Sequence, residues 1–341
     1  AIAIGAFINT KYPDIDIRII AIIAYFLFTF INIIGVKAAA SFELVITVLA
    51  VIELLIFAGV TLPHFEFSNL QINAFPNGVS GIFAAIPFAI WFFLAIEGVA
   101  NVAEETINPQ RNVLIGFGTA ILTLVILCIL TFLSSIGIAG WEAIVYPGGT
   151  TVATDAPLLA ALKTLLGENH FLYNLLISVG LLGLVASFHG IILAAGRATF
   201  EFGRVGYAPR ILGKTHKRFR TPAFALIVNM LIGIIAIMTG KTADIITIAC
   251  FGAVGLYIIS MISFFKLRKN EPNMHRPFKV PFYPLFPILA LVISSIAMVA
   301  LIVHNLALAG IFFGILILSM LWFNFFVSDE IKQEALKWKM G

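Results

Sequence analysis

The chain has 341 residues, of which 61% are hydrophobic and only 11% are charged, and its formal net charge is +4. Soluble domains are about half apolar and a quarter charged, so this composition, with a mean hydropathy of +1.06, excludes a soluble protein and predicts an all-α polytopic membrane protein. The basic residues lie between the apolar segments instead of along one stripe, which argues against nucleic-acid binding.

Hydropathy averaged over windows of about 19 residues predicts nine membrane-spanning helices. In chain order they are residues 18–36, 38–60, 81–103, 113–137, 171–196, 223–240, 244–265, 285–304 and 306–326. Residues 1–9 indicate the end of an earlier helix, and no cleavable signal peptide is visible after Ala1. We therefore expect the chain to be an N-terminally truncated fragment with nine spans and a stub.

Glu97 lies inside the third predicted span, which is followed by a charged, turn-rich exit at residues 104–112. A charged side chain at the centre of a bilayer costs about 3 kcal/mol on insertion scales, so it needs a protein or water neighbour. A structural carboxylate held by a buried hydrogen bond would meet this need. We favour a functional role, because intramembrane acids usually mark substrate or ion pathways.

Basic residues gather in alternate loops. With the loops after the first, third, fifth and seventh spans and the C-terminal tail on one side, that side holds Lys37, Arg111, Arg197, Arg204, Arg210, Lys214, Lys217, Arg218, Arg220, Lys266, Arg268, Lys269, Arg276, Lys279, Lys332, Lys337 and Lys339. The other side keeps Lys11, Arg18, Lys163 and Lys241. The positive-inside rule places the basic side, including the tail of residues 327–341, in the cytoplasm, and it explains the basic loops without a ligand.

Two connections have patterns of their own. In the long loop of residues 138–170, Thr154 and Asp155 precede a predicted short capped helix that ends at Gly167. This segment is either a lid over an outer vestibule or a surface loop. Prolines throughout residues 272–287 predict an irregular connection.

Three segments, in the same order, resemble those of the amino acid–polyamine–organocation permeases. IWFFLAIEGVANVAEETINPQRNV (90–113) resembles the sixth helix and following loop of these permeases. SFHGIILAAGRATFEFGRVGYAPRILGK (187–214) resembles their eighth helix and its cytoplasmic continuation. HRPFKVPFYPLFP (275–287) resembles the loop between their tenth and eleventh helices. Within the family, the sequences of these segments most resemble those of the ethanolamine permease branch.

The resemblance implies a LeuT-type fold of five plus five helices in inverted repeats, with two further helices at the end. On this fold residue 1 falls at the close of the third helix, so the first two helices are absent. Residues 1–341 are then a single, partial transmembrane transporter domain in the cytoplasmic (inner) membrane. Because the broken first helix supplies half of the substrate site in such transporters, we do not expect the chain to transport alone.

The resemblance also implies a substrate site near the midplane of the bilayer, against unwound backbone of the sixth helix. The residues that match it are Trp91, Phe93, Leu94, Ala95, Ile96 and Glu97. Ala95 stands where relatives often carry Gly. Trp91 aligns with an aromatic gate, whose indole face attracts cations, although an ordinary packing or lipid-facing role is equally compatible with the sequence. Carbonyls released at the end of a half-helix suit an ammonium group.

Three residues are candidates for ion coupling. Glu97 matches the position that the resemblance links to proton coupling. Glu53, a second intramembrane acid, could pair with an amine, carry a proton or snorkel to the surface. His189 could be protonated or donate to substrate, or it could be a satisfied packing residue. Ala50 stands where some relatives have a Lys that replaces sodium, so proton and sodium both remain open as coupling ions.

These features predict a secondary active transporter of a small amine, with ethanolamine first, working by proton coupling or by exchange. An amino acid permease of the same superfamily is the alternative. A non-transporting truncated protein and a membrane-embedded enzyme are weaker alternatives, since no nucleophile–base pair or metal-binding motif is evident. We expect no cofactor and no metal, and the expected partners are the small-molecule amine or amino acid, the coupling ion and the lipid bilayer.

Overall fold

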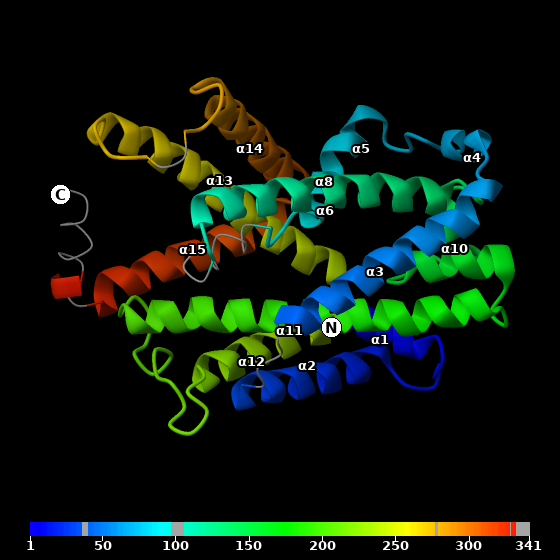
Figure 1. The fold of residues 1–341 in the computed structure, drawn as a ribbon, viewed down its shortest axis with the longest axis horizontal. Helices are drawn as coiled ribbons and strands as arrows, with labels where there is room; N and C mark the ends of the chain where they lie inside the picture. Colours follow the sequence, from blue (N-terminus) through cyan, green and yellow to red (C-terminus); the bar gives the residue numbers. More distant parts are fainter. Residues whose placement is uncertain (36–39, 97–105, 277–278, 328, 332–341) are drawn as a thin grey trace. The chain divides into compact units, whose positions relative to one another are not determined.

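The computed structural model describes the chain except for residues 36–39, 97–105, 277–278, 328 and 332–341 (Figure 1). The described residues form helices and connecting turns, without a β-strand. They divide into two compact units. The first comprises Ala1–Ala74, Ile129–Lys241 and Met320–Gly341, and the second comprises Phe75–Cys128 and Thr242–Ser319.

Seven helices in the described part are long and apolar enough to cross a membrane. They are Ile17–Ile34, Leu44–His64, Pro109–Ile136, Phe171–Arg204, Thr242–Asn270, Leu285–His304 and Leu306–Phe326, and each matches one of the nine predicted spans. An eighth predicted span corresponds to α12 (Ala223–Thr239), which has 17 residues. The remaining predicted span, residues 81–103, is divided into shorter pieces that are described below.

The first unit is organised around α11 (Phe171–Arg204), which has 34 residues and is therefore about 51 Å long. This helix packs against α1 (Ile2–Asn9), α2 (Ile17–Ile34), α3 (Ala40–Thr61) and α12 (Figure 1). It continues eight residues beyond the predicted end at residue 196, into a segment with Arg197 and Arg204. Hydropathy does not reveal this extension, because its charged residues lower the mean hydropathy while Thr199 bonds to Asn229 of α12 and Arg204 bonds to Glu201.

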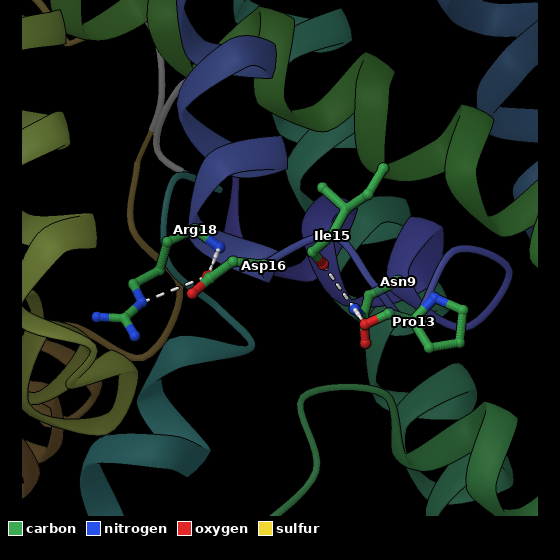
Figure 2. A network of polar contacts seen from close by, with 5 residues as sticks. All are labelled: Asn9, Pro13, Ile15, Asp16 and Arg18. Atoms are coloured by element: carbon green, nitrogen blue, oxygen red, sulfur yellow. Dashed lines mark hydrogen bonds and ion pairs between the residues drawn. The ribbon is translucent and has the colours of Figure 1, made fainter.

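Side-chain hydrogen bonds fix the reversal between α1 and α2 (Figure 2). Asn9, the last residue of α1, donates from Nδ2 to the carbonyl oxygens of Ile15 at 2.8 Å and Pro13 at 3.3 Å. Asp16 is the N-cap of α2, and its Oδ1 accepts from the backbone N–H of Arg18 at 2.7 Å. The Arg18 Nε lies 3.4 Å from the same oxygen. Because this ion pair is exposed, the cap contributes more to the turn than the charges do.

The loop of residues 138–170 is packed onto the first unit. It contains α9 (Trp141–Val145), the 3₁₀ turn η3 (Pro147–Gly149) and the expected helix α10 (Pro157–Leu166), which ends before Gly167 at φ +80°. Thr154 Oγ1 accepts from the N–H of Ala156 at 3.1 Å and not from a residue inside the helix. Leu159 and Leu162 of α10 are each 2% exposed, in a core shared with α1, α3, α9 and α11. The segment is therefore a fixed cover over one end of this unit.

The segment that follows α3 is bonded to the start of the 138–170 loop. η1 (Leu62–His64) and α4 (Phe67–Gln71) follow α3. Asn69 donates from Nδ2 to the carbonyl oxygen of Gly137 at 2.8 Å, and Asn73 donates to Glu142 Oε1 at 2.7 Å. These bonds tie the segment after α3 to the start of the 138–170 loop.

The second unit contains α5 (Gly78–Ala84), α6 (Ile86–Trp91), α13 (Thr242–Asn270) and α14 (Leu285–His304). Parts of α8 (Pro109–Ile136) and α15 (Leu306–Phe326) belong to each unit. The core of the second unit is built on Phe251, whose ring stacks on that of Phe312 with 5.5 Å between the centroids. Cys128 and Cys250 are not joined in a disulfide, and Cys250 is buried in this core.

The cover formed by α10 gives a first prediction. Replacing Leu159 with Ala leaves a cavity in the core that joins α10 to α3 and α11, so we expect the free energy of unfolding to fall by about 2–5 kcal/mol. Thermal unfolding in detergent micelles measures the change. Leu231→Ala, at an exposed position of α12, is the matched control and should be nearly neutral. Equal midpoints for the two variants would show that α10 does not stabilise the unit.

Candidate functional site

The helix that enters the predicted substrate segment stops at Trp91. Residues 92–96 form turns, in which Phe93 N donates to Ile90 O at 2.9 Å and Leu94 N donates to Trp91 O at 3.3 Å. Ala95 has φ +69°, a left-handed conformation that costs a residue with a Cβ about 1–2 kcal/mol. The backbone is therefore non-helical at the residues that the resemblance implied, and alanine occupies the position that favours glycine.

The short helix before this break is held firmly within its unit. Cys250 Sγ of α13 donates to the carbonyl oxygen of Pro87 at 3.0 Å. Ile86, Ile90 and Leu94 pack against the core around Phe251. The sequence alone does not indicate this bond, because the two residues are 163 positions apart. The break therefore follows a fixed helix end, where backbone carbonyls carry partial negative charge.

The candidate residues at the break differ in their surroundings. The side chain of Leu94 is half-buried and belongs to the core contacts, whereas Trp91 is exposed within the structure. Phe93 and Ile96 are half-buried and Ala95 is exposed. Glu97 lies outside the described residues, so its predicted coupling role remains a prediction.

Glu53 is buried, with only 8% of its surface exposed. Its carboxyl group lies against α11 at Gly180, where an added Cβ would be 2.7 Å from Glu53 Oε1 and 2.8 Å from Phe7 Cε1. Within the described chain no hydrogen bond or ion pair reaches this carboxyl group. The side chain therefore does not snorkel to the surface, and it occupies a niche that exists because residue 180 has no side chain.

His189 also lies on α11 but away from Glu53. Its ring is half-buried and meets the Phe28 ring edge-on, with 6.5 Å between the centroids. Nine residues separate Gly180 from His189 along the helix, which corresponds to about 13.5 Å. The first unit therefore does not bring His189 and Glu53 together.

The described residues include no group of three His, Cys, Asp or Glu side chains that could hold a metal ion. The polar features of interest are thus the helix break in the second unit and the buried carboxyl group in the first.

Comparison with known proteins identifies the family. The model of the amino acid permease family matches residues 1–332. The chain belongs to this family. Together with the seven long apolar helices, membership identifies a multi-pass membrane protein of the amino acid–polyamine–organocation superfamily.

Several curated transporters are similar to the chain. An uncharacterized transporter of Rhizobium meliloti is 27% identical over 89% of the chain and 65% of its own length. The methylthioribose transporter of Bacillus subtilis is 27% identical over 75% of the chain and 53% of its own length. A branched-chain amino acid permease of Bacillus subtilis is 24% identical over 77% of the chain and 54% of its own length. The chain thus spans between about half and two thirds of the lengths of these relatives.

The conformation of Ala95 gives a second prediction. Ala95→Gly should raise the free energy of unfolding by about 1 kcal/mol, because glycine adopts φ +69° without the Cβ strain. Ala89→Gly in α6 is the matched control, and it should lower the free energy by about 1 kcal/mol because its backbone is helical. Thermal unfolding of both variants measures the effects. A loss of stability at both positions would mean that Ala95 is not left-handed.

Proposed function

We propose that the protein is a secondary active transporter, and not an enzyme, and that its substrate is a small solute with a primary ammonium group. The observation that carries the proposal is the helix break after Trp91, with Ala95 at φ +69° and the preceding helix fixed through Pro87 and Cys250. Non-helical backbone in a membrane protein is tolerated where it lines a cavity or is buried in protein. The carbonyl end of a half-helix there attracts a cation.

Ethanolamine is the first candidate substrate, on the resemblance of residues 90–113 and 187–214 to the ethanolamine permease branch. It carries an ammonium group and no carboxylate, so acids and aromatic rings without a compensating base suit it. An amino acid is the second candidate. The family description and the branched-chain amino acid permease among the relatives support it, as does a b(0,+)-type amino acid transporter of Mus musculus that is 24% identical over 92% of the chain and 63% of its own length.

In this proposal Trp91, Phe93, Leu94, Ala95, Ile96 and Glu97 contribute to the substrate site. Glu97, Glu53 and His189 are the coupling candidates, with a proton or sodium as the ion, and exchange is the alternative to coupled uptake. The architecture is the LeuT-type inverted repeat, with α5 and α6 as the sixth helix of that fold. The protein lies in the cytoplasmic membrane with its C-terminus in the cytoplasm, where the basic loops agree with the positive-inside rule.

Uptake by the full-length protein in proteoliposomes tests the proposal. We expect saturable uptake of labelled ethanolamine driven by an inward proton gradient, with weak competition by leucine. Saturable uptake of labelled leucine that unlabelled ethanolamine inhibits only weakly would instead identify an amino acid permease. If neither solute is taken up, the proposal that the protein is a transporter of such solutes is contradicted.

A paired substitution tests coupling. Glu97→Gln should abolish the dependence of uptake on the proton gradient, because the amide cannot exchange a proton. Glu66→Gln, at an exposed position, is the matched control and should transport normally. Uptake by the Glu97 variant that still follows the proton gradient would remove Glu97 from the coupling mechanism.

A further inference from the structure

The first unit contains a cavity of about 210 Å³ between α3, α10 and α11. A space of 10–15 Å³, measured in the same way, admits one water molecule, so this cavity has room for a small organic molecule. Its lining consists of Leu49, Ile52, Glu53, Ile56, Phe57, Val60, Leu162, Leu172, Leu175, Leu176 and Val179. Ten of these eleven side chains are hydrocarbon, and the exception is the carboxyl group of Glu53.

Several hydroxyl groups buried in the described helices bond to their own backbone, whereas those of Thr29 and Ser134 have no partner there. The hydroxyl groups of Thr61, Thr247 and Ser294 donate to the carbonyl oxygen four residues earlier, at 2.8, 2.9 and 2.6 Å. A carboxylate has no proton to donate and can only accept. Glu53 therefore cannot be satisfied in this way when it is charged, and the lining of the cavity offers it no donor.

The carboxyl group is held in place at the wall of the cavity. The niche at Gly180 fixes it on the α11 side, while Phe57, at 1% exposed, and Leu162, at 2%, close the neighbouring walls. Burial without a partner favours the neutral form of a carboxyl group, and an opposite charge beside it restores the carboxylate. The geometry leaves room for such a charge beside Glu53 and for an apolar body beyond it.

The chemistry of the cavity selects among possible occupants. An anion would be repelled by Glu53. A hydrocarbon would fit the walls but would leave the carboxylate without a partner. A primary ammonium supplies three donors and a positive charge to the carboxylate, and an attached alkyl chain would be taken out of water by the leucine, isoleucine and valine side chains.

We propose that this cavity is a binding site for a small primary alkylammonium, with its nitrogen on the Glu53 carboxylate and its alkyl chain against Leu175, Leu176 and Val179. The site is formed by the first unit alone, whereas the helix break on which the proposed transport function rests belongs to the second. The two proposals can therefore fail separately.

Isothermal titration of the full chain in detergent micelles with n-butylammonium tests the site, with heats into empty micelles subtracted. We expect saturable binding of one equivalent, and binding at least about tenfold weaker for n-butanol, which has the same apolar body and no charge. Glu53→Gln should weaken n-butylammonium binding to the same extent. Glu66→Gln, which keeps Glu53 and removes an exposed carboxylate, should bind like the unsubstituted chain.

Equal binding of n-butanol and n-butylammonium, or unchanged binding by the Glu53 variant, would overturn the proposal and leave an apolar cavity only. Val179→Phe is a second variant that fills the space and keeps the acid, and it should also lose binding.

A measurement on the unsubstituted chain keeps the test valid if a variant does not fold. Dicyclohexylcarbodiimide is an apolar reagent that modifies buried carboxyl groups, and mass spectrometry of the Glu53 peptide reports its reaction. Saturating n-butylammonium should slow modification of Glu53, counted as the acylurea and the butylamide together, at least about tenfold, because the reagent no longer has access to the paired carboxylate. Labelling at the same rate with and without n-butylammonium would contradict the site.

Discussion

Internal hydrogen bonding of the backbone is the constraint on which the rest of this structure depends. A chain that is 61% hydrophobic can sit in hydrocarbon only if its N–H and C=O groups pair within the chain, and helices achieve this locally. The long apolar helices follow directly from this requirement. A place where the helix stops inside an apolar segment then needs a specific support, and α6 has one in the bond from Cys250 to Pro87 and in the packing of Ile90.

The same constraint separates the hydroxyl groups that bond to their own helix from the buried carboxyl group of Glu53. A hydroxyl group can return its proton to its own helix, as Thr61 and Ser294 do, and its burial then has little consequence beyond packing. A carboxylate has no such solution. In its charged form Glu53 therefore needs a partner that its own helix cannot supply, which distinguishes its burial from that of Thr61 or Ser294.

The sequence predicted the helices well where hydrophobic length alone defines them. The bounds expected for residues 285–304 and 306–326 agree with α14 and α15. Agreement was poorer where other forces extend or interrupt a helix. α13 continues to Asn270, through charged residues that lower the hydropathy but not the helix propensity. Within residues 138–170, α9 and η3 were not anticipated, because five- and three-residue elements carry too little periodicity to be seen.

The candidate site was only partly readable from sequence for a similar reason. The resemblance located the segment at Ala95, but no hydropathy window detects a break between apolar residues, and its stabilising contact joins positions far apart in the chain. Glu53 could be recognised as an intramembrane acid. Its niche could not be predicted, because Gly180 is one of several glycines in α11 and only the packing of α3 shows which glycine faces the acid.

In the first unit, the two glycines Gly180 and Gly183 both allow α3 to pack closely on α11 and leave the space that the Glu53 carboxyl group occupies. At Gly183 an added Cβ would lie 3.1 Å from Ala50 Cβ of α3, and one turn earlier the space beside Gly180 is filled by the Glu53 carboxyl group. The small residues that let α3 approach α11 closely therefore also hold the acid at the cavity wall. A cation that pairs with Glu53 binds to the packed state of these two helices, and by linkage it must stabilise that packing.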